Sequence, residues 1–578
     1  MKIALEHGHE DIVRLLFENG VKLHEEGCDA LQVASHHGRE AIVRLLLEFG
    51  ADVDSHGGPY RNPLWAASSQ GHENIIRILL EHGADSNAYG GDALWVASYE
   101  GHENVVRLLL QNGANVPRRS YRNPLSAASE RNHENIVRIL LEHHADINAH
   151  GCDALRIASY EGHENIVQLL LNNGADVNSP GGPYRTPLWA ASSQGHENVV
   201  RILLEHGANP NAHGCYAMWA ASYEGHEDII RLLIDNGANV NPGGGPVRNP
   251  LWAASRQGHE NIVQTLLEHS ANPNIPGCDA LHVASYEGHE NVARLLLKNG
   301  ADVNPGGGPD RNPLQAASRQ GHKNIVQMLL DHHADANAPG CDALHVASYQ
   351  GHENIVRLLF KNGARVNRES GPYGQVLQVA SHQGHQKIVQ LLLDCDANVN
   401  AQGGIYGHAL QAASDQGHED IVRLLIKFGA DVNLKGGLYG SAIQAASCQG
   451  HETTVLLLLE NGADAKAKGG LYGHALRAAS YQHHENIVLL LKSGSYVNGV
   501  RGLGANRALQ EAIDPVKGGA GVDVDAVQYE QSGWSASSLY LLYPMQASPN
   551  QDADEDSALQ HEEQTIQART NNFHASGR

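Results

Sequence analysis

The chain has 578 residues, of which 41% are hydrophobic but only 5% aromatic, so we expect a core of Leu, Ile, Val and Ala. Its formal net charge of −23 disfavours direct binding to nucleic acid or to an anionic membrane, because phosphates would be repelled. There is no apolar run of about 18 residues and no secretory segment at the start. With seven cysteines, the composition predicts a soluble protein of the cytoplasm or, alternatively, the nucleus.

One sequence unit recurs along the chain from residue 1 to about 498. Its most regular part reads GHENIIRILLEHG at 71–83 and GHENVVRLLLQNG at 101–113. The glycine position returns sixteen times between Gly8 and His483, at steps of 30 to 33 residues. A short unit, GCDALHVASYEGHE, alternates with a long unit, GGPYRNPLWAASSQGHE, until a uniform unit begins at about residue 371.

Each unit predicts two helices followed by a loop. In the copy CDALHVASYQGHENIVRLLFKNGARVN, residues 341–367, small apolar residues form a stripe along the first helix. Gly351 ends that helix and permits a tight turn. The second helix is expected to start at Glu353, near its positive end, and Arg357 lies four residues later in position for a surface ion pair. The Gly-, Asn- and Pro-rich segment that follows predicts an extended turn.

The stretch ALHVASYQGHENIVRLLFKNGARVN resembles an ankyrin repeat, whose pattern is TPLHxA, then GH, then IVxLLLxxGADVN. The resemblance covers residues 1–498 in about sixteen copies and implies an all-α solenoid of antiparallel helix pairs with projecting hairpin loops. The uniform unit is similar to the ankyrin arrays of fungal proteins that often carry a NACHT nucleotide-hydrolase domain. This chain has no GxxxxGK[ST] phosphate-binding loop, so the NACHT part is absent from it.

Both ends of the array depart from the repeat. Met1 aligns with Leu31, so the first copy begins inside its first helix. We interpret this as a truncated gene or a degenerate copy of a longer protein, or as an end that a partner covers. Residues 499–513 match half a unit and are expected to form a partial capping repeat, whereas the acidic segment 514–578 is expected to be disordered.

The many histidines and the repeated cysteines could suggest a metal or catalytic site. Neighbouring helices pack about 8–10 Å apart, whereas zinc ligands lie within about 4 Å of one another. The repeated histidines therefore predict turn residues that bond to the backbone of the turn, and no metal site. Cysteines two repeats apart cannot reach disulfide geometry. These turn cysteines are Cys28, Cys152, Cys215, Cys278 and Cys341.

The resemblance implies that partners contact the hairpin tips and the exposed face of the first helix. Trp often replaces the His of TPLH in the N-terminal half, and Tyr often precedes GH. Trp, Tyr and Arg are enriched in interfaces. The predicted partner-binding residues are Trp65, Trp95, Tyr99, Tyr160, Trp189, Trp219, Tyr223, Trp252, Tyr286 and Tyr349 on the first helices, and Tyr60, Arg61, Arg122, Tyr184, Arg185, Arg248 and Arg311 in the hairpins. The alternative is that the indoles simply pack against the next repeat.

From this sequence we expect a non-catalytic, monomeric scaffold or adaptor without cofactor or metal. It would bind other proteins along the concave groove of an ankyrin solenoid, with rigid rings as anchors. Two alternatives remain at this point. The chain could be the regulatory or sensor arm of a truncated NACHT-type signalling protein, or a transcriptional co-regulator that acts through bound proteins.

Overall fold

The structure is a computed structural model, and it describes residues 2–19, 24–25, 28–56, 60–88, 92–116, 123–149, 153–179, 186–212, 216–242, 249–275, 279–305, 312–338, 341–368 and 374–497. The chain divides into two compact units, residues 1–302 and 303–578. The expected capping repeat, 499–513, and the expected disordered tail, 514–578, lie outside the described residues.

The described part of the first unit consists of helix pairs joined by loops. Its first helices are α1 (Lys2–His7), α3 (Ala30–His36), α5 (Pro63–Gln70), α7 (Asp92–Glu100), α9 (Pro124–Glu130), α11 (Ala154–Glu161), α13 (Pro187–Gln194), α15 (Ala217–Glu224), α17 (Pro250–Gln257) and α19 (Ala280–Glu287). Its second helices are α2 (Glu10–Glu18), α4 (Glu40–Glu48), α6 (Glu73–Glu81), α8 (Glu103–Gln111), α10 (Glu134–Glu142), α12 (Glu164–Asn172), α14 (Glu197–Glu205), α16 (Glu227–Asp235), α18 (Glu260–Glu268) and α20 (Glu290–Lys298). A small antiparallel hairpin, β1 (His24–Glu25) and β2 (Cys28–Asp29), precedes α3.

The second unit continues the same pattern. Its first helices are α21 (Pro313–Gln320), α23 (Ala343–Gln350), α25 (Val376–His382), α27 (Ala409–Asp415), α29 (Ala442–Gln449) and α31 (Ala475–Tyr481). Its second helices are α22 (Lys323–Asp331), α24 (Glu353–Lys361), α26 (Gln386–Asp394), α28 (Glu419–Lys427), α30 (Glu452–Glu460) and α32 (Glu485–Val497). The described residues thus contain 32 helices in sixteen pairs, which confirms the predicted all-α solenoid.

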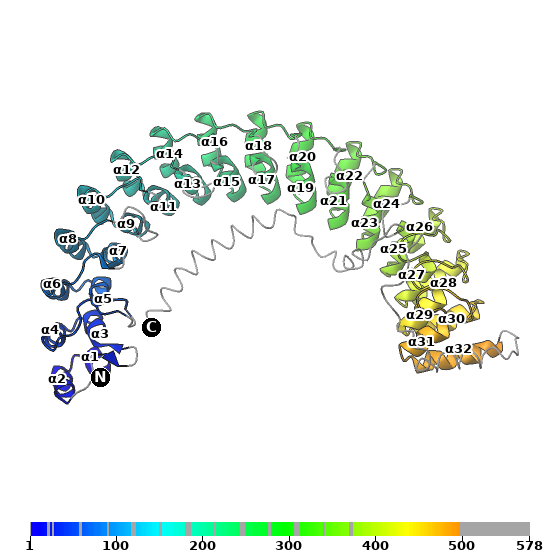
Figure 1. The fold of residues 1–578 in the computed structure, drawn as a ribbon. Coiled ribbons are helices and arrows are strands. Elements are labelled where there is room, and N and C mark those ends of the chain that lie inside the picture. Colours follow the sequence, from blue (N-terminus) through cyan, green and yellow to red (C-terminus); the bar gives the residue numbers. More distant parts are fainter. Residues whose placement is uncertain are drawn as a thin grey trace. The chain divides into compact units, whose positions relative to one another are not determined.

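Within each unit, first helices pack against the first helices of neighbouring repeats, and the second helices form a second row behind them (Figure 1). In the first unit the first helices lie on the inner side of the arc (Figure 1). Ala190 and Ala191 of α13 are fully buried at this interface, and their small side chains allow close approach. Val200 and Leu203 of α14 are fully buried in the layer between the two rows. Each unit therefore has one continuous aliphatic core.

Local sequence explains where the helices start. In the long repeats a polar side chain caps the first helix, and proline follows at the first position of that helix. For example, the Asn62 side-chain oxygen accepts a hydrogen bond from the Trp65 backbone N–H at 2.6 Å, and Thr186 Oγ1 accepts one from Trp189 at 3.2 Å. Second helices usually start with glutamate. The predicted surface pair is present in α24, where Arg357 Nη2 lies 2.8 Å from Glu353 Oε1.

The histidine that follows the turn glycine ties its repeat to the preceding one. His196 Nε2 lies 2.9 Å from the backbone oxygen of Tyr160 in the preceding first helix. The same contact recurs along both units, for instance from His385 to Tyr349 at 2.9 Å. We expected these rings to bond to their own turn, but the acceptor belongs to the neighbouring repeat. The histidines therefore act as ties between repeats.

An asparagine near the end of most repeats makes a second tie, this time to the following repeat. Asn241 Oδ1 accepts a hydrogen bond from the Asn272 backbone N–H at 2.8 Å, and its Nδ2 donates to the Ser270 backbone oxygen at 2.9 Å. In the second unit, Asn400 Oδ1 accepts a bond from the Asp431 backbone N–H in the same way, at 2.7 Å. These bonds satisfy backbone N–H and C=O groups in the loops that would otherwise lack a hydrogen-bond partner within the protein.

The first repeat exposes apolar side chains that are buried elsewhere. Ile12 is 49% exposed and Leu15 is 60% exposed, whereas the equivalent residues Ile42 and Leu45 of the next repeat are only 1% and 2% exposed. Ile3 of α1 is 71% exposed. The outer face of α1 and α2 therefore lacks the polar character that a terminal repeat usually has.

Candidate functional site

Aromatic side chains gather on the first helices of the first unit, as the sequence predicted. We call them the aromatic row. Its members are Trp65 of α5, Trp95 and Tyr99 of α7, Tyr160 of α11, Trp189 of α13, Trp219 and Tyr223 of α15, Trp252 of α17 and Tyr286 of α19. Tyr99 and Trp189 are each 9% exposed, and the other members are half-buried. The row therefore lies at the boundary between the core and solvent.

The interior of the row is packed between repeats. Trp189 forms a buried cluster with Ala190 of its own helix and Ala220 of the next first helix. Tyr160 from the preceding repeat and Trp219 from the following one pack against this cluster. At Trp189 the structure thus agrees with the alternative that the indole packs against the next repeat.

Two tryptophans stack on a tyrosine one helical turn later. The rings of Trp95 and Tyr99 lie 5.4 Å apart with an interplanar angle of 17°, and those of Trp219 and Tyr223 lie 5.3 Å apart at 21°. Residues four apart face the same side of a helix, which brings the rings together. Because each pair fixes the conformation of its rings, little side-chain entropy remains to be lost on binding.

Arginines lie over several rings of the row. The guanidinium carbon of Arg131 is 4.3 Å from the centre of the Tyr99 ring, and its Nη2 donates to the Tyr99 hydroxyl at 2.5 Å. Arg256 lies 5.3 Å from the centre of the Trp252 ring. Such cation–π contacts contribute about 0.5–1 kcal/mol at exposed sites. These two arginines were not among the predicted residues, although their place at the end of a first helix was visible in the repeat pattern.

The hairpin pair Tyr60 and Arg61 contacts its own repeat array. Tyr60 stacks on His36 of α3, with ring centres 4.1 Å apart. Arg61, at a positive φ of 59°, forms an ion pair with Asp92 of α7 and lies 5.9 Å from the centre of the Trp65 ring. Burial, together with the charges of the neighbouring His37 and His72, lowers the pKa of His36 to about 4.

The other predicted residues fall into two groups. Tyr349 of α23 is half-buried, like Tyr160 and Tyr286, and its backbone oxygen is held by His385. The remaining predicted residues lie outside the described part of the chain. They are Arg122, Tyr184, Arg185, Arg248 and Arg311.

Glutamine occupies the tryptophan position in four first helices of the second unit, and two of these side chains donate to the following loop. Gln378 is 1% exposed, and its Nε2 donates to the backbone oxygens of Ala401 and Gly407 at 3.0 and 3.1 Å. Gln444 is 3% exposed and donates to the following hairpin in the same manner. The amide thus fastens the next loop with two donated bonds, whereas an indole has a single N–H donor.

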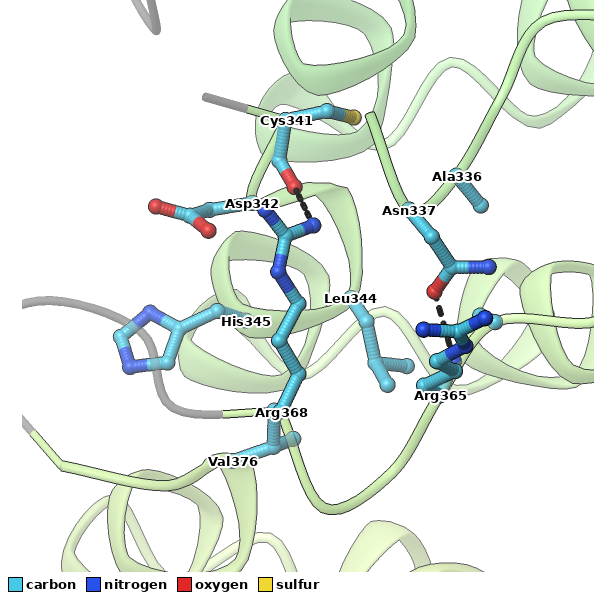
Figure 2. A pocket seen from close by; sticks show the side chains of 10 residues that line it. Ala336, Asn337, Cys341, Asp342, Leu344, His345, Arg365, Arg368 and Val376 are labelled. Atoms are coloured by element: carbon cyan, nitrogen blue, oxygen red, sulfur yellow. Dashed lines mark hydrogen bonds between the residues drawn. The ribbon is translucent and has the colours of Figure 1, made fainter. Parts of the chain in front are cut away.

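A small recess lies beside α23 in the second unit, at the stretch where cysteine, histidine and aspartate crowd together in the sequence. Figure 2 shows the Arg368 side chain beside His345. Arg368 Nη1 donates a hydrogen bond to the Cys341 backbone oxygen at 3.1 Å. The recess has a volume of about 20 Å³, room for about one water molecule. Burial raises the pKa of the Cys341 thiol to about 11. The thiol is therefore neutral at pH 7 and a poor nucleophile.

No group of three or more His, Cys, Asp or Glu side chains in the described part of the chain could hold a metal ion. Likewise, no helix among the described residues is long and apolar enough to cross a membrane. What the first unit presents is a surface of rings, carboxylates and guanidinium groups.

A family profile matches most of the repeat array. The family profile described as "Ankyrin repeats (3 copies)" matches residues 1–57, 55–120, 118–181, 180–243, 244–306, 305–370 and 373–436, and no catalytic domain is detected. The crystal structure of the human ASB11 ankyrin repeat domain is 29% identical over 36% of this chain and 98% of that one, with a TM-score of 0.34. A search of curated proteins gave no match. Neither finding supports the expected similarity to fungal NACHT-associated arrays.

Proposed function

Because the chain belongs to the ankyrin repeat family, we propose that it is a non-catalytic scaffold that binds another protein through the aromatic row of its first unit. The observation that carries this proposal is the position of the rings. They recur on the first helices, which form the inner row of the first unit, and all but the buried Tyr99 and Trp189 are half-buried. Rings of this kind dominate the energetics of protein interfaces.

The packing of the row favours binding without a large ordering cost. Trp219 already stacks on Tyr223, and Trp95 on Tyr99, so a partner meets a surface whose rotamers are set. Association would then retain most of the free energy gained by burying the remaining exposed area. The surface of the first helices that carries the aromatic row is the one through which the scaffold would act.

The test compares two photo-reactive versions of the full chain in cells. A photo-reactive phenylalanine analogue replaces Tyr223 of the aromatic row in one version and Arg231, exposed on α16, in the other. We expect a specific crosslinked protein only from position 223. Equal crosslinking from both positions would contradict the proposal.

Substitutions then test whether the rings supply the binding energy. The variant Trp95→Gln/Trp219→Gln/Trp252→Gln introduces the residue that the second unit accommodates at this position. We expect at least a tenfold loss of the crosslinked product, with helicity retained by circular dichroism. A control variant on the second helices, Arg138→Gln/Arg201→Gln/Arg231→Gln, should crosslink like the wild type. Undiminished crosslinking by the tryptophan variant would rule out the aromatic row as the binding surface.

A further inference from the structure

Five first helices of the first unit end in a carboxylate. We call these residues the acidic edge. They are Glu100 of α7, Glu130 of α9, Glu161 of α11, Glu224 of α15 and Glu287 of α19. All except Glu130 are exposed. Two guanidinium groups lie near the ends of these first helices, those of Arg131, directly after α9, and Arg256, near the end of α17. The edge therefore carries excess negative charge beside the rings.

The structure shows that the edge and the rings are electrostatic neighbours. Burial raises the pKa of Tyr99, and the charges of Glu130 and Glu100 raise it further. The pKa of Glu130 is also raised, first by burial and then by the charge of Glu161 in the next repeat, against the opposing effect of Arg131. Carboxylates from successive repeats thus act on one another and on the same ring.

Arg131 shows what kind of group this surface accepts. Its guanidinium lies over the Tyr99 ring and donates to the ring's hydroxyl, with acidic residues on either side. A planar cation satisfies the ring face and the carboxylates at once. The pattern of a ring followed by a carboxylate returns at Tyr160–Glu161, Tyr223–Glu224 and Tyr286–Glu287.

In the second unit, glutamine side chains occupy the equivalent surface. Glutamine stands at the end of each described first helix of the second unit or directly after it, as it also does in α5, α13 and α17 of the first unit, and hydrogen bonds engage several of these second-unit side chains within the protein. Gln449 Nε2 donates to Asp415 Oδ1 at 2.9 Å and to the Tyr439 hydroxyl at 3.1 Å. Tyrosine therefore lies beside a glutamate at the ends of four first helices of the first unit, whereas in the second unit Tyr349 is followed by glutamine.

We propose that the aromatic row and acidic edge of the first unit bind an extended basic segment of a partner protein, with arginine or lysine side chains on the rings and carboxylates. This inference rests on the proposed function and specifies the chemistry of the partner. Ring–carboxylate pairs recur every two repeats. Because neighbouring first helices pack about 8–10 Å apart, successive pairs lie about 16–20 Å apart. An extended chain rises about 3.3 Å per residue. Basic residues in the partner should thus recur at intervals of about five to six positions.

Charge argues against the other occupants. The chain's own segment 514–578 contains ten acidic and only three basic residues, so the acidic edge would repel it. Nucleic acid would be repelled for the same reason. A basic polypeptide is the occupant that complements both the charge and the rings.

The test uses the full-length protein and synthetic peptides of 24 residues with one variable residue every six positions in a Gly/Ser background. The variable residue is arginine, glutamine or glutamate. Binding is measured by isothermal titration calorimetry at low and high salt. The key variant is Glu100→Gln/Glu161→Gln/Glu224→Gln. Its control, Glu81→Gln/Glu142→Gln/Glu205→Gln, makes the same change in net charge at exposed ends of second helices.

We expect the arginine peptide to bind at least tenfold more tightly than the glutamine peptide and the glutamate peptide not to bind. The acidic-edge variant should lose at least tenfold in affinity, whereas the control variant should stay within twofold of the wild type. Equal losses of affinity in both variants would mean that net charge alone explains the binding, and this would overturn the inference. Failure of the arginine peptide to bind, or equal affinity for the arginine and glutamine peptides, would also overturn it. In those cases, a specific crosslink from position 223 would still support the proposed function. If that crosslink is absent as well, both the proposed function and this inference fail.

Discussion

A single glycine meets two constraints at the turn that joins the helices of a repeat. Gly162 has a φ of +78°, a conformation that L side chains rarely adopt, and a Cβ there would lie 2.6 Å from the ring of His196. Gly174, at the end of the same repeat, has a φ of +85° but no atom within 4 Å of such a Cβ. The two positions therefore separate backbone strain from the contact between repeats.

We predict that Gly162→Ala destabilises the protein more than Gly174→Ala. Both changes incur the strain of a left-handed backbone, about 1 kcal/mol, but only the first displaces the His196 ring from its carbonyl. The extra cost should be about 1 kcal/mol, the net value of one hydrogen bond. Asn132 fills the equivalent position in another copy, where the corresponding His163 contact is retained at 3.2 Å. Urea denaturation followed by circular dichroism measures the difference, and equal losses would refute the role of the ring.

At this scale the sequence predicted residue types better than their partners. The recurrence of Gly351 and Glu353 located the turn and the start of α24, because glycine and glutamate have strong positional preferences. The acceptor of His385 could not be predicted in this way. It is a backbone oxygen in the preceding repeat, and a carbonyl leaves no trace in a sequence.

Among the elements, the loops depend on side chains from the preceding repeat. Asn241 Oδ1 accepts from the backbone N–H of Asn272, and its Nδ2 donates to the backbone oxygen of Ser270. By contrast, the Asn236 side chain donates only to the Leu232 backbone oxygen of its own helix, α16. One asparagine joins two repeats, whereas the other stabilises the end of one helix.

The variant Asn241→Ala should therefore cost about 1–3 kcal/mol, since two hydrogen bonds are lost, and Asn236→Ala should cost about half as much. Hydrogen exchange provides the sharper measurement. The amide of Asn272 loses its acceptor in the first variant and should exchange faster, while it should be unaffected in the second. Unchanged protection of Asn272 in Asn241→Ala would contradict the tie between repeats.

For the whole molecule, the sequence predicted about sixteen helix pairs, and the described residues contain sixteen. The helix pairs group into two compact units, residues 1–302 and 303–578. Trp252 in the first unit and Gln315 in the second occupy the same position of the first helix, and the boundary lies between them. Gln315 Oε1 accepts from the Asp342 backbone N–H at 2.9 Å, so the exchange also changes how loops are fastened. The repeat period alone carries no information on such a division, because it is the same on both sides.

Buried histidines in both units predict how stability depends on pH. Burial lowers the pKa of His36 to about 4 and also lowers that of His345, His382 and His408 below the ordinary value of 6.5. Below pH 6.5 the unfolded chain thus binds more protons than the folded one, and acid favours unfolding. The stability contributed by these groups should be fully present above pH 6.5 and should be lost progressively as the pH falls towards 4. Melting curves between pH 8 and 4.5 should show Tm falling below pH 6.5.

The variant His36→Phe keeps an aromatic ring against Tyr60 but cannot be protonated, so its Tm should fall less steeply on acidification. His82→Gln, at the exposed end of α6, provides the matched control and should follow the wild type. An identical pH dependence in His36→Phe and the wild type would exclude His36 as a source of the effect.

The ties made by His196 and Asn241 end on backbone atoms of the neighbouring repeat, and backbone atoms are the same in every copy. The joint between repeats is therefore standardised, while the ring and carboxylate positions beside it can change without altering it. A gene for such a protein can gain or lose whole repeats by recombination and still encode compatible neighbours. Binding specificity in this chain can thus evolve by rearranging finished parts as well as by point mutation.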